Sequence, residues 1–236
     1  MDLTGKFQDH FSVFDDVCSL DDIHAKAESR KNHMLMYRTL VTKLLRSYWR
    51  GDLITAEEHL RNARLNPFSK YGTYCLTHTL FGGLVSFHLY RKMGGDDRLK
   101  EAREMLEVVG KLAETSMDVF GSRWALLKAE DAASCDETMN DAEQLYKTAI
   151  EAARKHGNMH ELGLTYSLFG DYYALQGATL DSMDCFAAAQ ANYSQWGATA
   201  VAEAMLRNRD LDMSSHISSL SAENESDIGG SKRRRD

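Results

Sequence analysis

Two histidines and an acid are the residues of this chain whose spacing comes nearest to metal chemistry. His156 and His160 are four positions apart, with Glu161 beside them. On an unbroken helix this spacing would place both imidazoles on one face, as zinc ligation requires. However, Gly157 and Asn158 lie between them and are typical of a helix end. We therefore expect no metal site here.

The remaining candidates for chemistry have structural explanations. His78 and His88 lie three turns apart in an apolar helix, which favours core or groove histidines over ligands. The four cysteines form no C-x-x-C pair, so their spacing indicates neither a zinc site nor a disulfide framework, and reduced thiols are expected. Neither Gly5-Lys6 nor Gly110-Lys111 is followed by Ser or Thr, which excludes a Walker-type phosphate loop. We expect no enzymatic activity and no cofactor.

The amino-acid composition favours a helical protein, whose helices would serve to position binding residues. The chain has 236 residues, of which 43% are hydrophobic and 27% charged, and Pro67 is its single proline. This composition predicts an all-α protein. The net charge of -7 disfavours binding to nucleic-acid phosphates. The sequence has neither a signal peptide nor an apolar run long enough to span a bilayer, so we expect a cytoplasmic protein that does not enter the membrane.

One helix-turn-helix repeat stands out between residues 159 and 196. Large and small residues recur there at the positions that a tetratricopeptide repeat uses. Small residues are needed where two antiparallel helices approach closely, and Gly177 suits the turn between them. The residues of this pattern are Tyr166, Phe169, Gly170, Tyr173, Gly177, Ser182, Phe186 and Ala189.

Similar hairpins are predicted upstream, with turns near Gly51, Gly95 and Cys135. Their period is longer than the roughly 34 residues of standard tetratricopeptide repeats. The first helix is expected to begin near Leu20 after the capping residue Ser19, and a second capping signal begins at Thr138. Residues 20–50 form either one very long helix or two with a break near residues 30–33. The fold predicted for residues 19–208 is a right-handed solenoid of about four tetratricopeptide-like hairpins, closed by a C-terminal capping helix.

The two ends of the chain differ from this domain. In residues 1–18, Phe7, Phe11, Phe14 and Val17 are spaced for one helical face, which predicts a docking segment, with a partner-anchoring peptide as the alternative. Residues 209–236 are rich in serine and contain no aromatic residue, so we expect disorder. Lys232 to Arg235 form a basic cluster that could act as a nuclear-import signal.

The chain also resembles a known group of helical repeats. The resemblance lies in residues 46–53, in His78 with residues 89–91, and above all in residues 142–200, including the Tyr-x-x-Trp-Gly-Ala of residues 193–198. Over about residues 36–208 the sequence resembles the repeat region that follows the ATPase module in large sensor kinases and predicted ATPases. It is similar, more distantly, to the repeat domain of maltose-type transcription activators. The resemblance implies a scaffold or sensory domain coupled to a nucleotide-driven switch, but the chain itself has no P-loop, kinase or receiver segment.

Two functions follow as hypotheses. The first is a non-enzymatic interaction scaffold in signalling or regulation, whose first helices line a groove for a peptide or helix of a partner protein, with an ATPase- or kinase-containing partner as one candidate. The second is a small-effector sensor, or a detached regulatory domain of such a switch, with a pocket bordered by the Gly82-Gly83 helix and His78. The residues expected to face the groove are Arg38, Tyr48, Trp49, His78, Ser167 and Asp171.

Overall fold

The computed structural model of the chain describes residues 19–70, 73–207 and 209. Within these residues all regular structure is helical, as the sequence predicts. The elements are α2 (Leu20–Ser29), α3 (His33–Trp49), α4 (Leu53–Arg64), the 3-10 helix η1 (Pro67–Lys70), α5 (Thr73–Met93), α6 (Asp96–Thr115), α7 (Met117–Ala132), α8 (Met139–Lys155), α9 (Met159–Leu175) and α10 (Thr179–Trp196). A terminal helix follows over residues 199–207 and includes residue 209.

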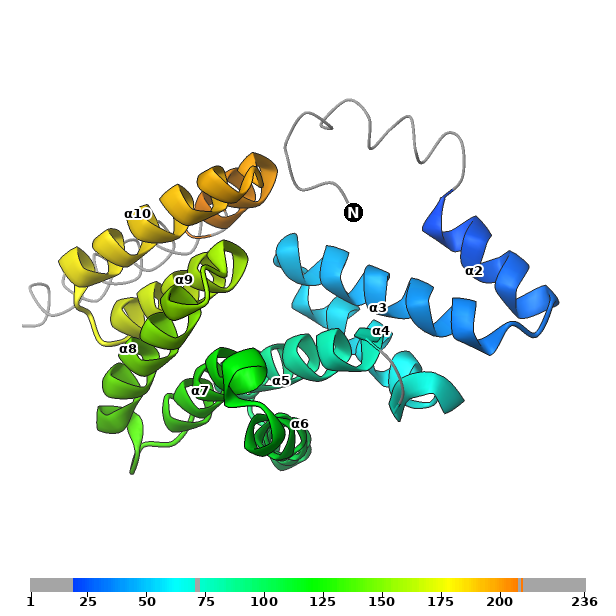
Figure 1. Cartoon of the computed structure of the whole chain (residues 1–236), viewed down its shortest axis with the longest axis horizontal. Helices are drawn as coiled ribbons and strands as arrows, with labels where there is room; N and C mark the ends of the chain where they lie inside the picture. Colours follow the sequence, from blue (N-terminus) through cyan, green and yellow to red (C-terminus); the bar gives the residue numbers. More distant parts are fainter. Residues whose placement is uncertain (1–18, 71–72, 208, 210–236) are drawn as a thin grey trace, which may run out of the picture.

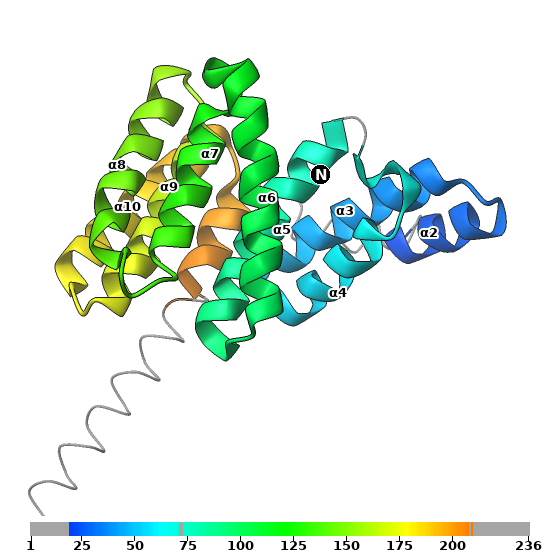
Figure 2. The ribbon, with the colours of Figure 1, turned by 90° about the horizontal axis from the view of Figure 1, so that it is seen from below.

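The helices form an array of antiparallel hairpins in chain order. The pairs are α3 with α4, α5 with α6, α7 with α8, and α9 with α10, while α2 packs on α3. Figure 1 shows that the hairpins follow an arc, so that the end of α3 points toward α9 and the end of the described chain. The terminal helix packs on α10, where Val201, Ala202 and Met205 contact Phe186 and Tyr193. The view of Figure 2 shows the same succession of hairpins from below.

Local signals explain where most helices begin and end. The Ser19 side chain accepts a hydrogen bond of 3.0 Å from the Asp22 amide, so the predicted first cap is confirmed. Of the two alternatives for residues 20–50, the structure shows two helices, because Lys31 has a φ of 53° and Asn32 caps α3. Gly51 and Gly177 have φ values of 76° and 72°, which suit glycine at the predicted turns.

Thr138 is the N-cap residue of α8, as the capping signal predicts, but the expected side-chain bond is absent. The Thr138 side chain makes no capping bond to α8 and instead donates to the carbonyls of Ala132 and Cys135. It therefore stabilises the turn between α7 and α8. A threonine hydroxyl can serve the turn or the helix, and sequence spacing does not decide between them.

Glycines allow the hairpins to pack closely. A Cβ at Gly82 would lie 2.6 Å from the Met105 sulfur, and one at Gly83 would lie 2.9 Å from Leu127. In the last hairpin, Phe186 packs against Gly170, and the Ser182 hydroxyl donates to the Gly170 carbonyl over 2.9 Å. The large-small pairing predicted for residues 159–196 is therefore confirmed at these positions.

None of the helices among the described residues combines the length and apolarity needed to cross a membrane. The docking segment predicted for residues 1–18 lies outside the described part of the chain. The same holds for the disorder predicted for residues 209–236, apart from Arg209, and for the basic cluster at Lys232 to Arg235. These expectations remain predictions.

Candidate functional site

Aromatic residues at the end of α3 bring the first hairpin against the last one. The Trp49 ring meets Tyr193 of α10 edge-on, with centroids 5.6 Å apart and planes at 90°. The same ring lies 5.8 Å from Phe81 of α5 and 5.4 Å from Tyr48, its neighbour in the sequence. Because edge-to-face pairs are favourable, this cluster fixes the end of α3 against α10.

A cavity of about 290 Å³ opens beside this cluster, between α3, α5, α9 and the terminal helix. Tyr48 and Trp49 provide its aromatic wall. Leu164, Leu168 and Met205 provide much of its apolar lining. Its volume lies at the lower limit of about 300 Å³ for small-molecule pockets, so it suits one or two inserted side chains or a small compound.

An ion pair forms the polar wall of this cavity. Arg209 of the terminal helix binds both carboxylate oxygens of Asp171 on α9, at 2.8 and 2.6 Å. Arg209 also donates to the Ser167 hydroxyl over 2.6 Å, and its guanidinium lies 4.9 Å from the centroid of the Phe186 ring. This two-point geometry fixes both charged groups and connects α9 to the end of the described chain.

His88 and Lys92 of α5 also line the cavity. Burial, together with the positive charges of Arg91, Lys92 and Arg209, lowers the pKa of His88 to about 3. The imidazole is therefore neutral at physiological pH. Asp171 offsets the charge of Arg209, and Lys92 lies at the exposed rim of the cavity.

Tyr193 leaves a polar atom unsatisfied near this cavity. Its side chain is fully buried, and its hydroxyl has no hydrogen-bond partner among the described residues. Burial is the main cause that raises its pKa, and Tyr48, Arg209 and Asp171, which all line the cavity, also act on it. A buried hydroxyl without a partner costs about 1 to 3 kcal/mol, and Tyr193 is not among the residues that line the cavity.

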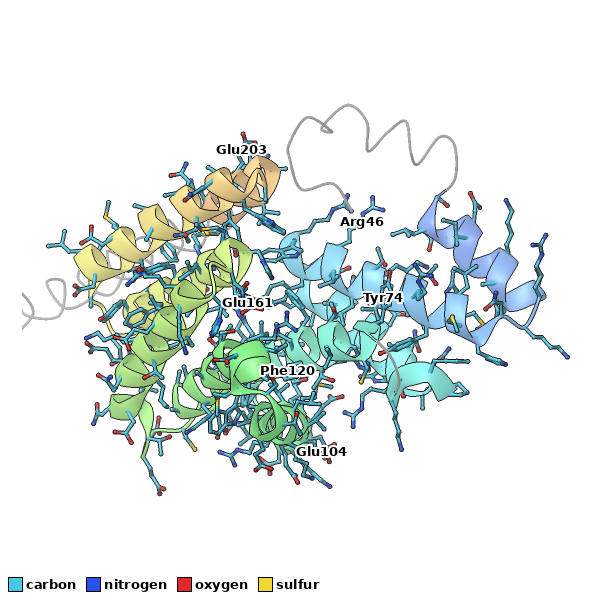
Figure 3. The ribbon with its side chains drawn as sticks, viewed as in Figure 1. Arg46, Tyr74, Glu104, Phe120, Glu161 and Glu203 are labelled. Carbon is cyan, nitrogen blue, oxygen red and sulfur yellow. The ribbon has the colours of Figure 1, made fainter. Side chains whose placement is uncertain are left out.

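Two buried carboxylates lie deeper in the array and have structural partners. Glu130 on α7 is fully buried, binds Arg91 of α5 over 2.7 Å and accepts a hydrogen bond from Tyr146 of α8. Glu161 on α9 binds Arg123 of α7 over 2.7 Å and accepts a bond from the neighbouring Ser122 (Figure 3). Each group joins successive hairpins, so these carboxylates hold the array together.

The structure brings four of the six predicted groove residues to this cavity: Tyr48, Trp49, Ser167 and Asp171. Arg38 instead donates to the Tyr74 hydroxyl over 3.3 Å and does not line the cavity. His78 is only 4% exposed and shares a hydrogen bond of 3.0 Å with the Tyr37 hydroxyl.

The pocket predicted beside the Gly82-Gly83 helix is filled by side chains. Met105, Leu60 and Leu127 occupy the space next to the two glycines. Burial lowers the pKa of His78 to about 4, and within the described part of the chain its Nε2 atom has no hydrogen-bond partner. The cavity found in the structure lies nearer the C-terminal end of α5, at His88.

Sequence reasoning did not identify His88, Lys92, Met205 or Arg209 as residues of the site. Arg209 was assigned to the tail because the composition changes there. A usable signal exists, however, because Val201, Met205 and Arg209 follow one another at four-residue steps. That spacing places the arginine on the buried face of the terminal helix.

Neither metal ligands nor similar proteins assign a function to this cavity. Within the described residues, no group of three or more histidines, cysteines or acids is arranged to hold a metal ion. No protein-family model, curated protein or solved structure matches the chain. The resemblance to the repeat regions of sensor kinases and predicted ATPases therefore remains a prediction.

Proposed function

We propose that this protein is a non-enzymatic helical-repeat scaffold, acting in signalling or regulation, that binds a partner protein at the cavity between α3 and α9. The main support is the combination found there: the aromatic rings of Tyr48 and Trp49 face the fixed polar group formed by Ser167, Asp171 and Arg209. Aromatic and arginine side chains around a small desolvated pocket are typical of the centres of protein interfaces.

The size of the cavity defines what the partner contributes. A volume of about 290 Å³ accepts one or two side chains, not a whole helix. The sequence resemblance makes a protein with an ATPase or kinase module the first candidate partner.

Affinity purification of the tagged chain from its own cell extract tests this proposal. Trp49→Ala removes the aromatic wall, and Lys92→Glu reverses the charge at the exposed rim of the cavity. Lys100→Glu makes the same charge change on the exposed surface of α6 and serves as the control. Proteins captured by wild type and the control but lost in both cavity variants are then purified and titrated with each variant.

The expected result is one discrete partner whose affinity falls at least about tenfold, or 1.4 kcal/mol, in both cavity variants and is unchanged in Lys100→Glu. A partner that binds all four proteins equally would contradict the proposed site. Circular dichroism of each variant excludes unfolding as the cause of lost binding.

The size of the cavity, about 290 Å³, also favours a second candidate, a sensor of a small effector that would fill the same cavity. Screening small carboxylates and phosphates for a rise in melting temperature tests this alternative. A rise that Trp49→Ala abolishes and Lys100→Glu leaves unchanged would support the effector sensor and displace the scaffold as first choice.

A further inference from the structure

The second helices of the hairpins share a sequence pattern. Each has a buried small residue: Ala56 in α4, Ala102 in α6, Ala142 in α8 and Ser182 in α10. In α4, α6 and α8, the residues one and five positions after this small residue have opposite charges. These pairs are Glu57 and Arg61, Arg103 and Glu107, and Glu143 and Lys147.

The last hairpin departs from this pattern. At the same two positions α10 has Met183 and Ala187, and Met183 is 56% exposed. Three residues before Met183 lies Leu180, which is 79% exposed. No described element covers these two side chains. At the corresponding positions Glu57 pairs with Arg98 of α6 and Arg103 pairs with Asp131 of α7, whereas α10 has exposed apolar side chains there in place of charges.

The exposed stripe on α10 has a symmetric spacing. Its members, Leu180, Met183, Ala187, Ala191 and Ser194, are all exposed and follow one another at steps of three, four, four and three residues. The pattern therefore reads the same in both directions about Ala187. Large side chains occupy its first half and small ones its second half.

We infer that this stripe, through Leu180, Met183, Ala187 and Ala191, is a self-association surface on which α10 pairs antiparallel with α10 of a second copy of the chain. A two-fold axis at Ala187 places Met183 against Ala191 of the second copy, and Leu180 against Ser194 of the second copy. Large residues then meet small ones, as close helix packing requires. An isologous contact of this kind closes as a dimer.

Charge selects this arrangement over a parallel one. Asp181 and Asp184, which flank the first half of the stripe, are exposed. In a parallel pair each aspartate would face the same aspartate of the second copy, and the two negative charges would repel each other. In the antiparallel pair, the six-residue offset between Asp184 and its copy separates them by about 9 Å along the axis. A single helix pair buries little area, so the dimer is weak and depends on concentration.

Sedimentation of the full chain over a range of about 5 to 500 µM tests the proposal, because a weak dimer dissociates within it. Wild type is expected to shift from monomer to dimer, and Met183→Glu to remain a monomer. Ile54→Glu is the matched control, since Ile54 is 56% exposed and holds the position in α4 that Leu180 holds in α10. This control is expected to dimerise like wild type.

A second variant tests the register. Met183→Glu combined with Ala191→Lys places opposite charges face to face across the proposed axis, so dimerisation is expected to return. Within one chain the two residues are two turns apart and do not pair. A wild type that stays monomeric at every concentration would overturn the proposal, as would dimers that tolerate Met183→Glu. Failure of the double variant to restore the dimer would overturn it too.

The other occupants of the stripe have distinct outcomes. If a segment of the same chain covered it, Met183→Glu would lower the melting temperature of a protein that is monomeric throughout. If a different protein covered it, wild type would remain monomeric and keep its melting temperature in the variant. Either result overturns self-association. Because the stripe lies on α10 away from the α3–α9 cavity, loss of dimerisation and loss of partner binding are separate measurements.

Discussion

Trp49 and Tyr193 meet edge to face, with ring centroids 5.6 Å apart and ring planes at 90°, although they belong to the first and last hairpins of the array. A series of hairpins that contact only their neighbours would leave its two ends independent. This contact joins them. It also fixes the wall of the α3–α9 cavity, so the stability of the array and the shape of the cavity depend on the same residues.

The first prediction concerns the aromatic cluster. Trp49→Ala is expected to lower the free energy of unfolding by about 3 kcal/mol, because it removes a large ring packed on Tyr48, Phe81 and Tyr193. Urea denaturation followed by circular dichroism measures the change. Trp196→Ala is the control, since that side chain is 42% exposed, and it is expected to cost less than about 1 kcal/mol.

The second prediction concerns the ion pair at the cavity. Asp171→Ala leaves the guanidinium of Arg209 in place without the carboxylate that it binds at two points. We expect a loss of about 2 kcal/mol in the free energy of unfolding, less than for a fully buried pair because both side chains are partly exposed. Adding Arg209→Met should recover much of this loss. A double variant as unstable as the sum of the single changes would show that the pair is not coupled.

The third prediction tests the close packing of the last hairpin. Gly163→Ala places a methyl group 2.7 Å from the ring of Tyr193, so either α9 or the ring must move. Overpacking of this kind is expected to cost about 1 to 3 kcal/mol. Thermal unfolding of Gly163→Ala checks the prediction. Ala174→Gly, at an exposed position near the end of the same helix, controls for the change in helix propensity, which works in the opposite direction.

The fourth prediction is a pH dependence. Burial holds the pKa of His88 at about 3 and that of His78 at about 4, whereas both titrate near 6.5 when unfolded. The unfolded chain therefore binds more protons, and stability falls as the pH drops below about 6.5, by up to roughly 1.4 kcal/mol per pH unit for each histidine. His88→Gln should reduce this slope between pH 6.5 and 4. An unchanged slope in denaturant titrations would show that His88 becomes protonated in the folded protein.

The sequence predicted the local elements well because their causes are local. The Ser19 side chain caps α2 by accepting a hydrogen bond from the amide of Asp22, three residues later. Gly51 and Gly177 supply positive φ values that other residues avoid. These features act within a few residues of themselves. The hairpin array follows from them, since two helices joined by a short turn must return on each other.

The site could be predicted only in part because it depends on how the array curves. Tyr48 and Trp49 belong to α3, and Ser167 and Asp171 belong to α9, so no periodicity within either helix shows that they meet. Arg38 lies ten residues before Tyr48, which is about 15 Å along the helix, and its partner Tyr74 is correspondingly distant from the cavity. Glu57 shows the same limit, because it pairs with Arg98 of the next hairpin, whereas its spacing to Arg61 suggests a pair within α4.

The central claim, that a partner protein binds at the α3–α9 cavity, is tested most directly by hydrogen–deuterium exchange of the full chain with and without the captured partner. Binding at this cavity is expected to slow exchange in the complex at residues 45–53 of the first hairpin and 163–171 of α9. Residues 100–111 on the outer surface of α6 should be unchanged. Protection confined to α6, or to the outward face of α10, with none at the cavity segments, would contradict the account.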